Sequence, residues 1–73
     1  MPPEALQPLL AQAALRLAEA GCDTPQLDAR LLLQSATGLT RADMILEPSR
    51  LVEAQAVECF RNWVARRAAL TGA

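Results

Sequence analysis

The sequence predicts an all-α fold, a small orthogonal bundle of four to five helices formed by residues 1–73 as one domain. The chain is 52% hydrophobic, and much of that fraction is Ala and Leu, which favour helices. Phe60 and Trp63 are its only aromatic residues, and this scarcity disfavours strands. Apolar residues also recur at steps of three and four along most of the chain, which is typical of amphipathic helices.

The first helix is predicted to begin near Leu6 or Gln7, because Pro8 is tolerated only in a first turn. Gly21 is expected to end it as a left-handed cap. The apolar face of this helix comprises Leu6, Leu9, Leu10, Ala13, Leu17 and Ala20.

The second helix is predicted to follow Thr24 as its N-cap, with Pro25 at the first position, and to run to about Thr37 before Gly38. Its polar arc is narrow and comprises Gln26, Arg30, Gln34 and Thr37. The rest of its surface is apolar and comprises Leu27, Ala29, Leu31, Leu32, Leu33 and Ala36. A helix apolar over most of its circumference needs cover on several sides, so it is predicted to be the central helix.

A short third helix is expected from Thr40, with Asp43 completing a capping box and Pro48 ending the helix. Its inward residues are predicted to be Ala42, Ile45 and Leu46.

Residues 47–51 are expected to connect the third helix to a last helix that runs from about Val52 to Ala69. Val52 stands where a helix start favours Ser, Thr or Asp as the cap, so no capping residue marks the start of this helix. The core stripe is predicted to be Val57, Phe60, Val64 and Ala68, with Gln55, Glu58, Asn62 and Arg66 facing water.

The net charge of −1 argues against nucleic-acid binding, which usually requires a basic excess. A helix-turn-helix across Gln34–Met44 is a possible alternative, with Gly38-Leu39-Thr40 as its turn. Gln34 stands where that motif needs a small residue, and Asp43 and Glu47 would face phosphates. The sequence therefore argues against nucleic acid as a partner.

Catalytic and metal-binding patterns are missing from the sequence. There is no His, and Cys22 and Cys59 form no CxxC pair, so we expect free thiols and no metal site. No Gly-rich phosphate loop is present, and we expect neither a catalytic residue nor a cofactor-binding residue. The sequence contains neither a signal peptide nor an apolar run long enough to span a membrane, which predicts a cytoplasmic protein without a membrane partner.

Asp28 falls on the apolar arc of the second helix, so its carboxylate needs donors, either N–H groups at the start of a neighbouring helix or an arginine. The functional alternative for Asp28 is a catalytic acid. A second feature is the basic end of the chain. The chain from Cys59 onward holds Arg61, Arg66 and Arg67 and no acid. Trp63, Arg66 and Arg67 are the candidate partner-binding residues, because Trp and Arg are favoured at interfaces; the alternative is that these arginines only complement the dipole of the helix.

Three stretches in order resemble the N-terminal domain of the HemK/PrmC family, the methyltransferases that modify a glutamine of peptide chain release factors. They are Ala20-Gly21-Cys22-Asp23-Thr24-Pro25-Gln26-Leu27-Asp28-Ala29-Arg30-Leu31-Leu32-Leu33, then Thr37-Gly38-Leu39-Thr40-Arg41-Ala42-Asp43, and finally Phe60-Arg61-Asn62-Trp63-Val64-Ala65-Arg66-Arg67-Ala68. The first of these stretches and the closing Arg66-Arg67 pair are, in combination, fairly specific to this family.

The resemblance implies a two-domain enzyme in which a Rossmann-like catalytic domain, absent from this chain, binds S-adenosylmethionine. The family's Asn-Pro-Pro-Tyr motif does not occur here, so no catalytic residue is carried over. The implied role is to position the release factor so that its Gly-Gly-Gln loop is methylated. The implied partners are that release factor and the chain's own C-terminal methyltransferase domain. The alternative is a stand-alone helical protein-interaction or DNA-binding module.

Overall fold

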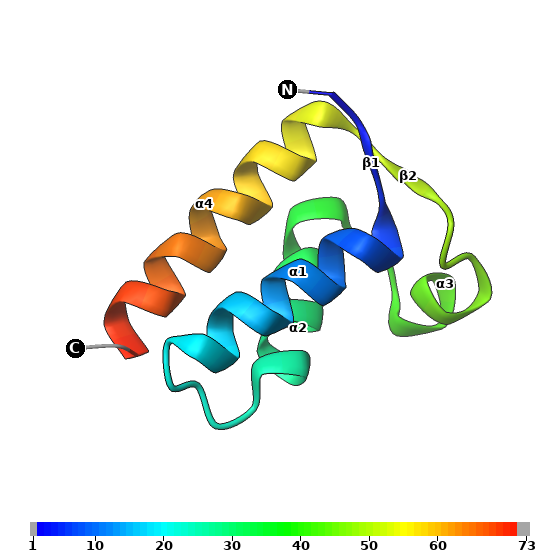
Figure 1. The fold of residues 1–73 in the computed structure, drawn as a ribbon. Helices are drawn as coiled ribbons and strands as arrows, with labels where there is room; N and C mark the ends of the chain where they lie inside the picture. The colour runs from blue at the N-terminus through cyan, green and yellow to red at the C-terminus, as the bar shows by residue number, and fades with distance from the viewer. Residues whose placement is uncertain (1, 72–73) are drawn as a thin grey trace.

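Helices form most of the chain in the computed structural model, which describes residues 2–71 (Figure 1). The described residues form four of them: α1 spans Leu6–Glu19, α2 Pro25–Thr37, α3 Arg41–Leu46 and α4 Ala54–Thr71. The three longer helices pack against one another in every pairing, while the short α3 lies to one side (Figure 1). The prediction of a small all-α bundle with four to five helices is confirmed.

A two-stranded antiparallel pair joins the start of the chain to the segment before α4, and the sequence did not predict it. β1 (Glu4–Ala5) pairs with β2 (Leu51–Val52), with Glu4 opposite Val52 and Ala5 opposite Leu51. Two residues per strand carry almost no periodic signal, so the pair is visible only once the fold brings the segments together.

The N-terminus of α1 is capped by backbone carbonyl groups of the segment just before β2 rather than by a side chain. The N–H groups of Leu6 and Gln7 donate to the carbonyl oxygens of Arg50 and Pro48 at 2.8 and 3.0 Å. Pro8 has no N–H to satisfy, which suits its place in the first turn. The predicted start of the helix is confirmed, although its N-cap, Ala5, makes no side-chain bond.

Both predicted glycine caps are present. Gly21 has φ +95°, and its N–H donates to Ala18 O while the Cys22 N–H donates to Leu17 O, which together form a Schellman motif. Gly38 follows α2 at φ +76°, and its N–H donates to Gln34 O. A side chain with a Cβ would be strained at these dihedrals, so glycine at these two positions ends α1 and α2.

The capping box of α3 is confirmed, but the inward face predicted for this helix is wrong. Thr40 and Asp43 exchange side-chain bonds with each other's backbone N–H. Met44 is the buried residue of α3, whereas Ile45 and Leu46 are 65% and 78% exposed and Ala42 is also exposed. A helix of six residues at the side of the bundle presents only a narrow strip to the core, and Met44 occupies it.

α2 is covered on fewer sides than its composition suggests. It packs against α1 and α4, and its fully buried residues are Ala29 and Leu33. Leu27 and Leu31 are 41% and 50% exposed on its outer face. The prediction of an enclosed central helix is therefore wrong in this respect, because α3 is too short and too far aside to form a third wall (Figure 1).

The core lies between α1, α2 and α4, and the predicted stripe of α4 is confirmed. Val57, Phe60 and Val64 are buried and Ala68 is partly buried against the core, while Glu58 and Arg66 face water as expected. Gln55 and Asn62 are exposed too. The helix begins two residues later than predicted, since Val52 is a buried residue of β2.

Candidate partner-binding surfaces

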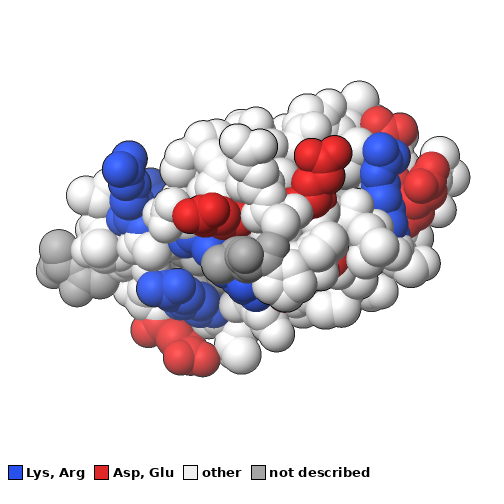
Figure 2. Space-filling view, turned by 90° about the horizontal axis from the view of Figure 1, so that it is seen from above, with Lys and Arg blue, Asp and Glu red and all other residues white. Residues whose placement is uncertain are grey.

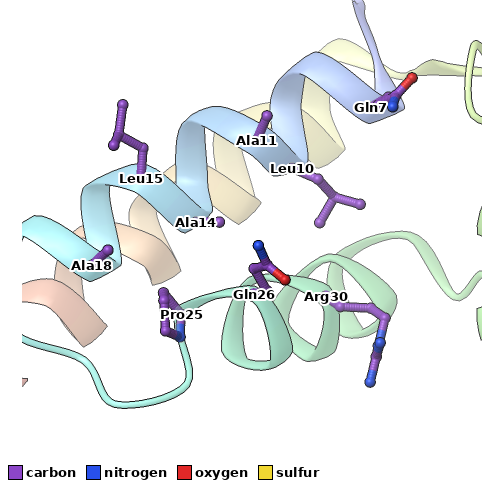
Figure 3. A pocket seen from close by; sticks show the side chains of 9 residues that line it. All are labelled: Gln7, Leu10, Ala11, Ala14, Leu15, Ala18, Pro25, Gln26 and Arg30. Atoms are coloured by element: carbon purple, nitrogen blue, oxygen red, sulfur yellow. The ribbon is translucent and has the colours of Figure 1, made fainter.

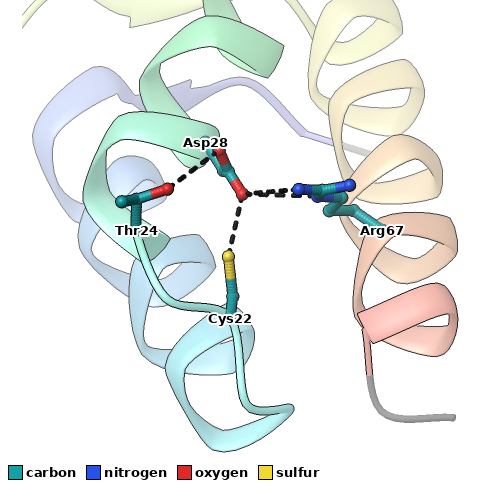
Figure 4. A network of polar contacts seen from close by, with 4 residues as sticks. All are labelled: Cys22, Thr24, Asp28 and Arg67. Atoms are coloured by element: carbon teal, nitrogen blue, oxygen red, sulfur yellow. Dashed lines mark hydrogen bonds and ion pairs between the residues drawn. The ribbon is translucent and has the colours of Figure 1, made fainter.

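Asp28 connects the start of α2 to the last turns of α4 (Figure 4). Nε and Nη2 of Arg67 donate to Oδ2 of Asp28 at 3.3 and 3.2 Å. The Cys22 thiol donates to the same oxygen at 2.8 Å, and the Thr24 hydroxyl lies 3.4 Å from Oδ1. Of the two arrangements that the sequence left open for this carboxylate, the arginine pair is the one formed.

The network shifts the acidity of both of its central groups. The hydrogen bond from the Cys22 thiol, followed by the Arg67 guanidinium, lowers the pKa of Asp28 below its ordinary value. The bond to the Asp28 carboxylate and partial burial raise the pKa of the Cys22 thiol. A raised pKa keeps this thiol protonated near neutral pH, which makes it a poor nucleophile. The arrangement stabilises the fold and does not suggest a reacting group.

The basic end of the chain is largely neutralised by acids from elsewhere in the fold. Arg61 holds Glu4 of β1 in a two-point pair, with N–O distances of 2.6 and 2.7 Å. Arg67 pairs with Asp28 through two nitrogens that both donate to Oδ2. Arg66, between them in sequence, is exposed and has no ion-pair partner among the described residues.

The three candidate partner-binding residues share one flank of α4. Trp63 and Arg67 are four residues apart and Arg66 is three from Trp63, so their side chains leave neighbouring turns of the helix. Trp63 is half-buried, Arg66 is exposed, and the guanidinium of Arg67 is engaged by Asp28. Arg66 and the exposed part of Trp63 are therefore the groups on this flank that a partner could contact.

Charges of both signs are interspersed over the face seen in Figure 2, and no continuous basic stripe crosses it. The helix-turn-helix alternative also gains no support from local geometry. Its second helix would be α3, which has six residues, and Asp43 lies in its first turn. Glu47, the acid that follows, is exposed and 3.9 Å from Arg50.

A groove between α1 and α2 was missed by sequence reasoning (Figure 3). It has a volume of about 580 Å³ and runs between the helices from the Gln7 and Leu10 end to the Ala18 and Pro25 end. Its α1 wall also includes Ala11, Ala14 and the 62%-exposed Leu15. The available signal was the recurrence of small residues at steps of three and four on α1, which sequence reasoning counted only as helix formers.

Cys22 and Cys59 are both free and partly buried. Among the described residues, no group of three or more His, Cys, Asp or Glu side chains is arranged to hold a metal ion. No helix within residues 2–71 is long and apolar enough to cross a membrane.

Comparison with known proteins gives a consistent result across most of the chain. Residues 8–70 match a family described as the PrmC N-terminal domain. The release factor glutamine methyltransferase of Nitratidesulfovibrio vulgaris is 44% identical over 63 residues, which is 86% of this chain and 21% of that protein. No solved structure gives a significant match.

Two further relatives carry the same name. The release factor glutamine methyltransferase of Caulobacter vibrioides is 40% identical over 53 residues, 73% of this chain and 18% of its own length. That of Deinococcus radiodurans is 39% identical over 64 residues, 88% of this chain and 23% of its own length. The chain spans about a fifth of the length of the curated relatives it matches. By its match over residues 8–70, the chain belongs to the PrmC N-terminal domain family.

Proposed function

We propose that this chain is the N-terminal domain of a release factor glutamine methyltransferase and helps to position the release factor for methylation of its Gly-Gly-Gln glutamine. The observation that carries the proposal is the family match over residues 8–70, together with the shared name of the relatives. Release factors act in translation, so the cytoplasm is the expected compartment.

Methyl transfer from S-adenosylmethionine belongs, in this proposal, to a separate C-terminal catalytic domain. The α1–α2 groove does not fit that cofactor, because none of its lining residues is an acid that could bind ribose hydroxyls. Its wall is formed by regular helices, without the glycine-rich turn of a nucleotide site. The contribution of this chain is binding energy that brings the reacting amide into place.

We propose the flank of α4 that holds Trp63, Arg66 and Arg67 as one contact with the release factor. Arg66 is the cleanest position to test, since Arg67 also stabilises the fold through Asp28. Arg66→Glu in the full enzyme is expected to raise the KM for release factor severalfold, because it reverses an exposed interfacial charge. Steady-state methylation kinetics measure this, and thermal melting should show an unchanged Tm.

Arg41→Glu is the matched control, since Arg41 is also exposed, has no ion-pair partner among the described residues and lies on α3. If Arg66→Glu has the same kinetics as the parent enzyme, this flank is not part of the interface.

A separate experiment tests whether this chain binds the release factor while the catalytic domain binds S-adenosylmethionine. The 73-residue chain is expected to show no saturable heat of binding with S-adenosylmethionine in calorimetry, whereas deletion of residues 1–73 should weaken use of the release factor as a substrate. A catalytic fragment with the same KM for release factor as the full enzyme would refute the positioning role.

A further inference from the structure

The last two turns of α4 extend past the core of the bundle. Val64 is the last buried residue of this helix, and Ala68 is partly buried against the core. Ala69 is exposed and Leu70 is 76% exposed. The helix ends at Thr71, seven residues after Val64, which is about 10 Å of helix. Apolar packing therefore holds this end of α4 weakly, and its direction depends on other contacts.

Arg67 ties this end of α4 to the start of α2 (Figure 4). Two nitrogens of its guanidinium lie 3.2 and 3.3 Å from Oδ2 of Asp28. The Cys22 thiol donates to the same oxygen at 2.8 Å, and the backbone N–H of Asp28 donates to Thr24 O. The Asp28 side chain is 16% exposed, so the pair is partly shielded from water. A carboxylate held in this way on the α2 side determines where Arg67, and with it the end of α4, can lie.

The end of α4 is also where the chain leaves this domain in the proposed domain order. The family match is to an N-terminal domain and ends at residue 70. The matched relatives are longer proteins, of which this chain covers 18 to 23%. In that order, the direction of the last turns of α4 sets the direction in which the catalytic domain follows.

We propose that Asp28 and Arg67 are positioning residues of the full enzyme, whose ion pair fixes the end of α4 and thereby the orientation of this domain toward the catalytic domain. This inference rests on the proposed function and adds how a bound release factor is aligned. A protein substrate that contacts both domains reaches the reacting geometry when the two domains are held in one arrangement. Trp63 and Arg66 then supply the contact of the α4 flank, and Arg67 holds the helix that carries them.

The test uses the full-length enzyme with purified release factor as the substrate. Asp28→Asn and Arg67→Gln are each expected to lower kcat/KM for release factor about fivefold, because the bound substrate is misaligned. The KM for S-adenosylmethionine should stay at the parent value, since only the alignment of the protein substrate is lost. Small-angle X-ray scattering of both variants should show a larger radius of gyration than the parent, because the domains are no longer held in one arrangement.

Glu4→Gln is the matched control, since it removes the other ion pair of α4. Glu4 pairs with Arg61 near the opposite end of the helix, beside the strands that precede it (Figure 1). Its loss leaves the end of α4 held by Asp28, so kcat/KM and the scattering should equal those of the parent. If Glu4→Gln lowers kcat/KM as much as Asp28→Asn does, the effect reflects lost stability and the proposal is overturned.

A double-mutant cycle separates positioning from direct contact. If the pair acts as a unit, Asp28→Asn combined with Arg67→Gln lowers kcat/KM no further than either change alone. Losses that multiply would overturn the proposal, because Arg67 would then contact the release factor independently of Asp28. Parent values of kcat/KM or of the radius of gyration in Asp28→Asn would overturn it as well.

Deletion of residues 1–73 distinguishes a failure of this inference from a failure of the proposed function. If the deletion weakens use of the release factor and Asp28→Asn does not, the ion pair has no positioning role and the proposed function stands. If the deletion leaves use of the release factor unchanged, the proposed function fails and this inference fails with it.

Discussion

Asp28 shows how far reasoning at a single position can reach. Its place on an apolar arc predicts that its carboxylate must find donors. The donors are the thiol of Cys22, six residues earlier, and the guanidinium of Arg67, 39 residues later. Cys22 lies close to α2 in the sequence, whereas Arg67 reaches Asp28 only because α4 packs against α2.

Asp28→Asn should destabilise the domain modestly at neutral pH. The substitution removes the charge that pairs with Arg67, and because this arginine is half exposed we expect a loss of about 1 kcal/mol or less. Urea or thermal unfolding at pH 7 measures it. Asp23→Asn is the control, since Asp23 is exposed in the connection between α1 and α2 and makes no ion pair among the described residues.

The pH dependence of stability should change with the same substitution. The folded pKa of Asp28 lies below its ordinary value of 3.8, so its stabilising effect is present above that value and is lost as the pH falls through the folded pKa. The parent should therefore lose more stability than Asp28→Asn between neutral pH and the acid limb. Parallel stability curves for the two proteins would show that the Asp28–Arg67 pair is energetically silent.

At the scale of the elements, the starts of α1, α2 and α3 are each satisfied in a different way. α3 uses a side-chain capping box, α1 uses carbonyl groups of the connection before β2, and α2 relies on Pro25 at its first position. Thr24 occupies the predicted N-cap position of α2, but its hydroxyl lies toward the Asp28 side chain and caps no backbone N–H. Capping preferences thus located the helix starts without identifying the group that does the capping.

Thr40→Ala should cost more stability than Thr24→Ala. The Thr40 hydroxyl accepts from the Asp43 N–H at 3.1 Å, and loss of such a cap costs about 1 kcal/mol. Thr24 offers only a 3.4 Å contact to a carboxylate that keeps its other donors. Chemical unfolding of the two variants side by side measures the difference, and a larger loss for Thr24→Ala would contradict the assignment of the caps.

At the scale of the whole molecule, the core is formed mainly by α1, α2 and α4, with Met44 of α3 and Val52 of β2 added at its edge. Eleven hydrophobic residues are buried within the described chain, and α2 contributes two of them, Ala29 and Leu33. The radius of gyration is 11.4 Å, close to the value of about 11 Å expected for a compact chain of this length. The molecule is therefore compact even though α2 keeps an exposed apolar face.

Leu33→Ala and Leu31→Ala should separate the buried face of α2 from the open one. Leu33 is fully buried, so truncation is expected to cost about 2–5 kcal/mol, enough to unfold much of a domain this small. Leu31 is half exposed, and we expect a cost below about 1 kcal/mol for its truncation. Thermal melts followed by circular dichroism distinguish them, and coincident melts would place the core on a different face of α2.

Local information in the sequence determined the four helices, their glycine caps, the capping box of Thr40 and Asp43 and the buried stripe of α4. Each of these depends on residues within a few positions of one another, where spacing and dihedral preference act directly. The tertiary structure alone decided the β1–β2 pairing, the Glu4–Arg61 and Asp28–Arg67 pairs, the exposure of Leu31 and Ile45, and the α1–α2 groove. These features depend on which helix faces pack together, because the burial of a residue is set by the neighbours that cover it as well as by its own type.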